Sequence, residues 1–178
     1  MGRKDGFADA LLAWYDREGR DLPWRARPGA PLADPYHVLV SEVMLQQTTV
    51  AVVRQRFGPF VEQFPGVEAL AEAEEPEVLA AWAGLGYYRR ARSLHACVRA
   101  LVSEHQGAFP GSEAALKALP GIGDYTAAAI TSIAFGAPAV VVDGNIERVM
   151  ARVFAIAAPL PGSKKEIKAA AALLSPQE

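Results

Sequence analysis

Residues 118–130, ALPGIGDYTAAAI, decide the fold, and a second stretch, AVVVD, follows them and ends at Asp143. Pro120, Gly121 and Gly123 predict a tight turn between two helices, because glycine adopts positive φ at little cost. Backbone N–H groups at the start of the second helix would point outward and could bind a phosphate through the main chain alone. The pattern is also consistent with an ordinary corner between helices, so other residues must decide between these interpretations.

Length and charge limit the classes of protein to consider. With 178 residues and a formal net charge of −2, the chain can form one medium domain or two small ones with a buried core. No apolar run approaches the roughly 20 residues of a membrane span, and the N-terminus has no signal-peptide core. We therefore expect a monomeric cytoplasmic protein without a membrane partner, nucleoid-associated if bacterial. Its slight acidity means that any nucleic-acid affinity would come from local patches and backbone amides.

The side chains that usually bind metals are few and scattered. The single cysteine, Cys97, cannot form an internal disulfide or a multi-cysteine metal site, and we expect a buried structural thiol. His37, His95 and His105 have no ligand spacing and are expected on the surface or in packing roles. We therefore predict no metal site in this chain.

Ala-rich segments separated by glycine and proline predict an all-α fold, with residues 139–142 as the one strand-like exception. Gly58 and Pro59 are expected to break the helical stretch that contains them. Ser163 and Glu166 have the spacing of a capping box. Other helices are expected near residues 7–15, 35–47, 67–73, 76–83, 88–104, 113–119, 125–135 and 146–156.

Two carboxylates occupy positions that allow either a structural or a chemical role. Asp34 and Pro35 predict the start of a helix on which Glu42 shares an apolar face with Val38 and Leu45. A carboxylate there either has a buried partner or faces a cleft in which a raised pKa lets it carry a proton. Asp143 is placed as the N-cap of the next helix, a role that is worth about 1 kcal/mol by itself.

Residues 84–92, GLGYYRRAR, combine two glycines, two aromatic residues and three arginines. They predict a helix start with exposed stacking groups beside charges that could bind phosphate. The alternative is a pair of core tyrosines next to a solvated basic face.

Four motifs in this order, DPYHVLVSEVMLQQT, GLGYYRRAR, LPGIGDYTAAAI and VVDGNIERV, give the chain a specific resemblance over residues 24–152. It resembles the adenine DNA glycosylase branch of the endonuclease III superfamily of helix-hairpin-helix base-excision repair enzymes. The resemblance implies two helical lobes with the active site in the cleft between them. Residues 26–137 would form a six-helix barrel lobe with the helix-hairpin-helix at about 112–135, and residues 1–25 with 138–178 would form the second lobe.

The resemblance implies a monofunctional hydrolase that flips adenine, mispaired with 8-oxoguanine or guanine, out of duplex DNA and breaks its N-glycosidic bond. Glu42 matches the general acid and base of the family, and Asp143 would stabilise the oxocarbenium ion. Tyr125 stands where bifunctional relatives have a lysine nucleophile, so no Schiff base is expected. Tyr125 and Asn145 would form hydrogen bonds around the reacting centre.

The expected partner is double-stranded DNA that contains an adenine mispair. Gln46, Gln47 and Tyr88 match family positions near the site of intercalation. Arginines 89, 90 and 92 are expected near phosphates. The complete set of expected DNA-binding residues comprises one loop, one helix start and the hairpin: Gln46, Gln47, Tyr88, Arg89, Arg92, Gly121, Gly123 and Thr126.

The chain also departs from the family. Four cysteines that bind a [4Fe-4S] cluster, and a C-terminal domain that reads 8-oxoguanine, are missing from this sequence. We therefore expect either a piece that is truncated before the cluster cysteines or a cluster-free relative, with no cofactor held by these residues. Two alternatives remain for the function: a mismatch glycosylase for thymine or uracil, and a non-catalytic helix-hairpin-helix DNA-binding fragment.

Overall fold

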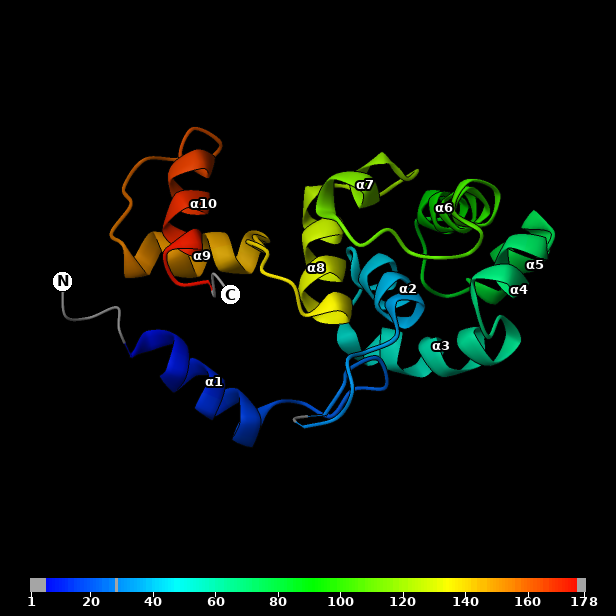
Figure 1. The fold of residues 1–178 in the computed structure, drawn as a ribbon, viewed down its shortest axis with the longest axis horizontal. Helices are drawn as coiled ribbons and strands as arrows, with labels where there is room; N and C mark the ends of the chain where they lie inside the picture. Colours follow the sequence, from blue (N-terminus) through cyan, green and yellow to red (C-terminus); the bar gives the residue numbers. More distant parts are fainter. Residues whose placement is uncertain (1–5, 28, 176–178) are drawn as a thin grey trace. The chain divides into compact units, whose positions relative to one another are not determined.

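The computed structural model describes residues 6–27 and 29–175, which form helices and connecting segments without a strand (Figure 1). The strand expected at residues 139–142 is therefore wrong, because this extended segment has no strand to pair with in the described part of the chain. Expectations for the first five residues, for residue 28 and for the last three lie outside the described residues. The helices are α1 (Phe7–Glu18), α2 (Pro35–Leu45), α3 (Val50–Gln63), α4 (Val67–Glu72), α5 (Glu75–Ala81), α6 (Arg89–His105), α7 (Glu113–Ala118), α8 (Asp124–Phe135), α9 (Gly144–Val153) and α10 (Lys164–Ala172).

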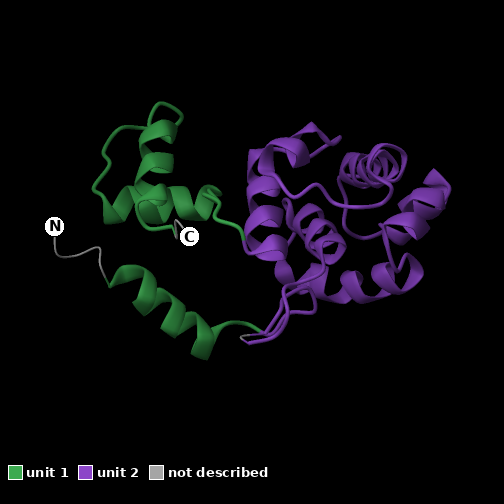
Figure 2. Cartoon of the chain, in the orientation of Figure 1, with its two compact units in different colours: residues 1–20, 137–178 green, residues 21–136 purple. Residues whose placement is uncertain are grey.

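The chain divides into two compact units, which Figure 2 colours separately. One unit is Asp21–Gly136, and the other combines Met1–Arg20 with Ala137–Glu178. The ranges expected from the sequence, 26–137 and 1–25 with 138–178, have similar extents. Their roles as the lobes of an active-site cleft stay a prediction.

Helix α2 lies at the centre of the larger unit and packs against α3, α6 and α8. It is apolar around most of its circumference, as expected for a helix that is enclosed by others. Asp34 caps it as predicted, since its carboxylate accepts hydrogen bonds from the backbone N–H groups of Tyr36 at 2.7 Å and His37 at 3.2 Å. The Tyr36 hydroxyl donates to the carbonyl oxygen of Phe64 at 2.7 Å and so joins the start of α2 to the end of α3. Burial raises the pKa of this phenol well above its usual value.

The smaller unit contains its own core and the exposed helix α1. Helices α9 and α10 pack together around Met150, Ile167 and Ala171, which are all buried. Helix α1 forms at the predicted place, but none of its residues is buried, and Leu11 and Trp14 are each 50% exposed. None of its apolar side chains belongs to a hydrophobic core cluster of the described residues.

Two sequence expectations about helix boundaries are wrong. Helix α3 continues through Pro59, which is an exposed residue of the helix, although its missing N–H removes the hydrogen bond to the carbonyl of Gln55. Ser163 is the N-cap of α10 but forms no capping hydrogen bond through its side chain, because its backbone is helical rather than extended (φ −82°, ψ 0°). Among the described helices, none has the length and hydropathy to span a membrane.

Candidate active site

The predicted hairpin consists of α7, a turn and α8. Ser112 caps α7 as expected by accepting a hydrogen bond from the backbone N–H of Ala115 at 3.3 Å. Leu119 and Ile122 are buried on either side of the turn and anchor it to the core of the larger unit. Helix α8 begins after Gly123, which has no side chain to cap the first N–H groups of the helix.

The two hairpin glycines differ in what their positions require. Gly121 has φ +75°, and a Cβ placed on it would lie 2.8 Å from the Cβ of Ser93 on α6. Gly123 has φ −91°, and a Cβ there would have no atom within 4 Å. The expectation that Gly123 also needs positive φ is therefore wrong, since any residue can adopt its backbone conformation.

We expect Gly121→Ala to destabilise the protein and Gly123→Ala to be much milder. At position 121 the methyl group adds a left-handed backbone penalty of about 1–2 kcal/mol and crowds Ser93. At position 123 the loss should stay below about 1 kcal/mol, because only a weak N-cap preference changes. Urea unfolding of both variants measures the difference. Equal losses would contradict the role given to Gly121.

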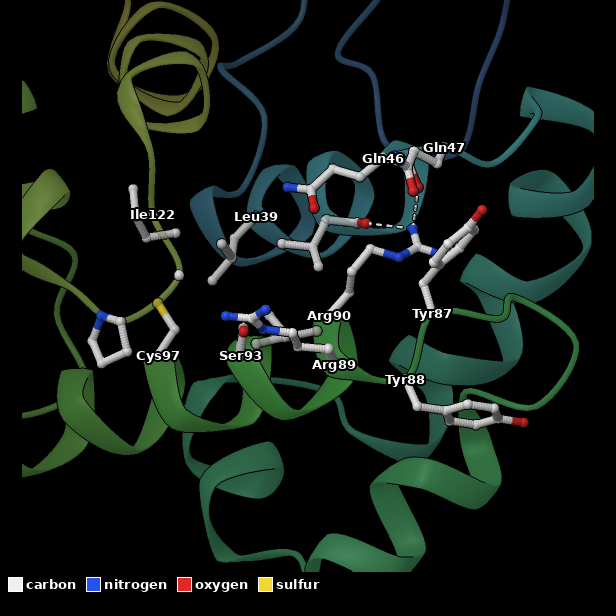
Figure 3. Close-up of a pocket in the computed structure, with 14 residues that line it drawn as sticks. Leu39, Gln46, Gln47, Tyr87, Tyr88, Arg89, Arg90, Ser93, Cys97 and Ile122 are labelled. Carbon is white, nitrogen blue, oxygen red and sulfur yellow. Dashed lines mark hydrogen bonds between the residues drawn. The ribbon is translucent and has the colours of Figure 1, made fainter.

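An open cavity of about 810 Å³ lies in the larger unit, where the end of α2, the start of α6 and the hairpin turn face one another (Figure 3). Tyr87 and Tyr88 are 63% and 42% exposed, so the alternative of a core tyrosine pair is wrong. The cavity brings together five of the residues expected to bind DNA: Gln46, Gln47, Tyr88, Arg89 and Gly121.

Three other residues of the expected set lie outside the cavity lining. Arg92 is about half exposed and pairs with Glu75 at 2.8 Å. Gly123 is exposed at the start of α8. Thr126 is buried, and its part in DNA binding stays a prediction.

The arginines expected near phosphates differ in exposure. Arg89 is exposed and lines the cavity, as a phosphate contact would require. Arg90 is only 9% exposed, and its guanidinium donates hydrogen bonds to backbone carbonyl oxygens, including those of Val43 at 2.9 Å and Met44 at 2.8 Å. The expectation that Arg90 contacts phosphate is therefore wrong. The reason is that the C-terminal carbonyls of a helix attract cationic donors, and α2 ends beside this arginine.

Cys97 forms part of the cavity wall as a buried thiol, as expected. Burial raises its pKa to about 12, so the reactive thiolate is suppressed near neutral pH. His95 is also buried, and its Nε2 has no hydrogen-bond partner among the described residues.

Glu42 and Tyr125 lie on helices that pack against each other within the larger unit. Glu42 is partly buried on α2, between the buried residues Ser41 and Val43. Tyr125 lies in the first turn of α8 and is 36% exposed. A partly buried carboxylate on a helix otherwise enclosed by apolar packing is consistent with either of the roles left open by the sequence.

Asp143 and Asn145 form a small polar cluster at the start of α9 in the other unit. One carboxylate oxygen of Asp143 accepts hydrogen bonds from the backbone N–H groups of Asn145 at 3.0 Å and Ile146 at 2.7 Å, so the predicted N-cap is confirmed. The second oxygen accepts from the side-chain amide of Asn145 at 3.0 Å. The approach of Asp143 to Glu42 across a cleft stays a prediction.

Sequence reasoning missed two features of this region. Ser93 and Ile122 line the cavity, and only the helical spacing of Ser93 from Arg89 could have indicated the first of them. Lys117 forms an ion pair with Asp124 across the hairpin, and this hydrogen bond raises the pKa of the lysine. The negative charge of Asp124 beside the hairpin turn is therefore balanced locally.

The residues present do not fit an iron-sulfur cluster. Such a cluster is held by four cysteine thiolates, and this sequence has one cysteine, which is buried in the cavity wall. Within the described residues, no group of three histidine, cysteine or acidic side chains could hold a metal ion.

The helical fold of this chain is that of helix-hairpin-helix proteins related to endonuclease III. A thermostable thymine-DNA glycosylase has a TM-score of 0.83 and 28% identity, with 96% of this chain and 77% of that chain covered. Endonuclease III in a trapped covalent complex with DNA has a TM-score of 0.75 and 25% identity, with 92% and 72% covered. The prediction of an all-α glycosylase fold is confirmed.

The chain belongs to the HhH-GPD superfamily of base excision DNA repair proteins, whose sequence model matches residues 40–176. It is 45% identical over 166 residues to an adenine DNA glycosylase of Mycolicibacterium smegmatis, which covers 93% of this chain and 55% of that protein. It is 49% identical over 156 residues to the adenine DNA glycosylase of Homo sapiens, which covers 85% of this chain and 29% of that protein. The chain thus spans about half of the first relative and less than a third of the second.

Proposed function

We propose that this chain is the base-excising part of an adenine DNA glycosylase. Its reaction would hydrolyse the N-glycosidic bond of adenine mispaired with 8-oxoguanine or guanine in double-stranded DNA. The observation that carries the proposal is the cavity that joins Gln46, Gln47, Tyr88 and Arg89 to the hairpin glycine Gly121. The identity of 45–49% to two adenine DNA glycosylases supports adenine as the base.

The proposed DNA-binding surface is the open side of this cavity. The start of α8 would bind a phosphate through backbone N–H groups, aided by the partial positive charge of a helix N-terminus. Arg89 would contact a neighbouring phosphate. Gln46, Gln47 and Tyr88 would fill the space that the extruded adenine leaves in the duplex, because unstacking is tolerated only when other groups replace the lost contacts.

In the proposed mechanism, Glu42 donates a proton to a nitrogen of the adenine imidazole ring as the bond from C1′ to N9 breaks. The electron pair of that bond leaves with adenine, and the sugar becomes an oxocarbenium ion that the carboxylate of Asp143 stabilises. Water then adds to C1′, and its proton returns to the carboxylate of Glu42. The products are free adenine and an abasic site with an intact strand, since Tyr125 supplies no amine for a Schiff base.

No step of this mechanism involves a cofactor, and we propose that these residues bind none. A [4Fe-4S] cluster would need thiolates that this sequence does not contain.

The first test is single-turnover incubation of the chain, in excess, with a duplex that contains adenine opposite 8-oxoguanine. We expect free adenine and sites that break only after alkali treatment. A second duplex of the same sequence, with thymine opposite guanine, tests the alternative of a mismatch glycosylase for thymine or uracil. The likeness to a thymine-DNA glycosylase favours that alternative. Duplex binding without release of either base would contradict both and would leave the non-catalytic DNA-binding fragment.

A further inference from the structure

One buried guanidinium joins two loops that are far apart in the sequence. On one side, Nη1 of Arg90 donates to the carbonyl oxygens of Val43, Met44 and Gln46 at the end of α2. On the other side, Nη2 donates to the carbonyl oxygens of Leu85 at 3.0 Å and Gly86 at 3.3 Å. Figure 3 shows Arg90 between Gln46 and Tyr87, with dashed lines to the carbonyl oxygens of Val43 and Gln46.

Two of the carbonyl groups that accept hydrogen bonds from Arg90 directly precede residues with strained backbones. Gln47 and Tyr87 have φ of 54° and 46°, a left-handed conformation that is uncommon for residues with a side chain. Gln47 directly follows Gln46, and Tyr87 directly follows Gly86, so each strained residue adjoins a carbonyl bound by Arg90. Such conformations persist only where the surrounding structure fixes them. Both side chains line the cavity.

We propose that Arg90 is a positioning residue whose guanidinium fixes the left-handed conformations of Gln47 and Tyr87 and thereby sets the shape of the cavity. The consequence for base release rests on the proposed function, whereas the conformational effect does not. Arg90 touches no substrate in this scheme and acts through the two loops.

The shape of the arginine side chain suits this role and that of lysine does not. A guanidinium presents donors in a rigid planar fork, so one side chain can serve acceptors on two sides at once, whereas a lysine ammonium is a single compact group. Two aromatic rings also contact the guanidinium through cation–π interactions. Cζ of Arg90 lies 5.5 Å from the centre of the Trp82 ring and 5.6 Å from that of Tyr87. The hydroxyl oxygen of Thr48 also accepts a hydrogen bond from Nη2, at 3.0 Å.

The test compares Arg90→Lys with Arg99→Lys, a control on the exposed side of the same helix. Backbone chemical shifts and three-bond HN–Hα couplings of Gln47 and Tyr87, measured by NMR on the free chain, report their φ angles. We expect both residues to leave the left-handed region in Arg90→Lys and to stay there in the control. Single-turnover release of adenine should fall by about 100-fold, as expected when contact groups move by about 1 Å.

Retention of positive φ at both residues in folded Arg90→Lys would overturn the proposal, whatever happens to the rate. If both residues leave that region while the parent chain releases no base, the positioning role stands and the proposed function fails. If Arg90→Lys does not fold, Thr48→Val removes one partner of the fork. The proposal then requires the HN–Hα coupling of Gln47 to report a departure from positive φ while that of Tyr87 is unchanged, and an unaltered coupling at Gln47 overturns it.

Discussion

A Glu42→Gln variant should bind an adenine mispair and release almost no adenine. Glutamine keeps the size of the side chain and its hydrogen-bonding capacity, so the packing of α2 should be preserved. An amide cannot donate the proton that adenine needs in order to leave, and loss of a general acid lowers rates by about 100- to 10,000-fold. Single-turnover release of adenine measures the first effect, and fluorescence anisotropy with the same duplex measures the second.

The control for this variant is Glu62→Gln on the exposed side of α3, which removes the same charge from the same unit. We expect it to release adenine at the rate of the parent chain. Retained turnover in Glu42→Gln would contradict the general-acid role and would leave Glu42 as a carboxylate with a structural partner. A large loss of duplex binding would instead show that Glu42 shapes the DNA-binding surface.

Helix boundaries could be predicted wherever a short local signal determines them. Asp34 with Pro35 starts α2, Ser112 starts α7, and Asp143 starts α9, because each carboxylate or hydroxyl bonds N–H groups within three residues. The expected break at Pro59 is wrong because tertiary packing overrides the local preference. The buried side chains of α3 pack against other helices and stabilise it despite the proline.

The cavity could be predicted only in part, since it depends on contacts between distant segments. The motifs indicated which loops carry exposed polar and aromatic groups, and the cavity includes five residues of the expected DNA-binding set. They could not indicate which arginine of residues 89–92 faces inward, because the orientation depends on how α6 packs against the end of α2. Arg90 shows this: the nearby arginines 89 and 92 are exposed, yet Arg90 is buried and several of its partners lie more than 40 residues away, as with Gln46 at a separation of 44.

The last prediction separates the two roles of Asp143. Its carboxylate caps α9, and the same group is proposed to stabilise the oxocarbenium ion. Asp143→Asn and Asp143→Ser both retain a good N-cap oxygen, so each should change the free energy of unfolding by less than about 1 kcal/mol. Both remove the negative charge, and loss of one electrostatic contact to a transition state lowers rates by about 100- to 1,000-fold.

Thermal unfolding and single-turnover adenine release, measured on the same samples, decide between these roles. A stable variant with a strongly reduced rate assigns Asp143 to the chemistry, because the helix cap is still in place. Equal rates in the parent chain and both variants would restrict Asp143 to capping. Asn145→Ala tests an intermediate case. It keeps the negative charge of Asp143 but removes the hydrogen bond from the Asn145 amide that orients the second carboxylate oxygen. Its rate should therefore lie between those of the parent chain and Asp143→Asn.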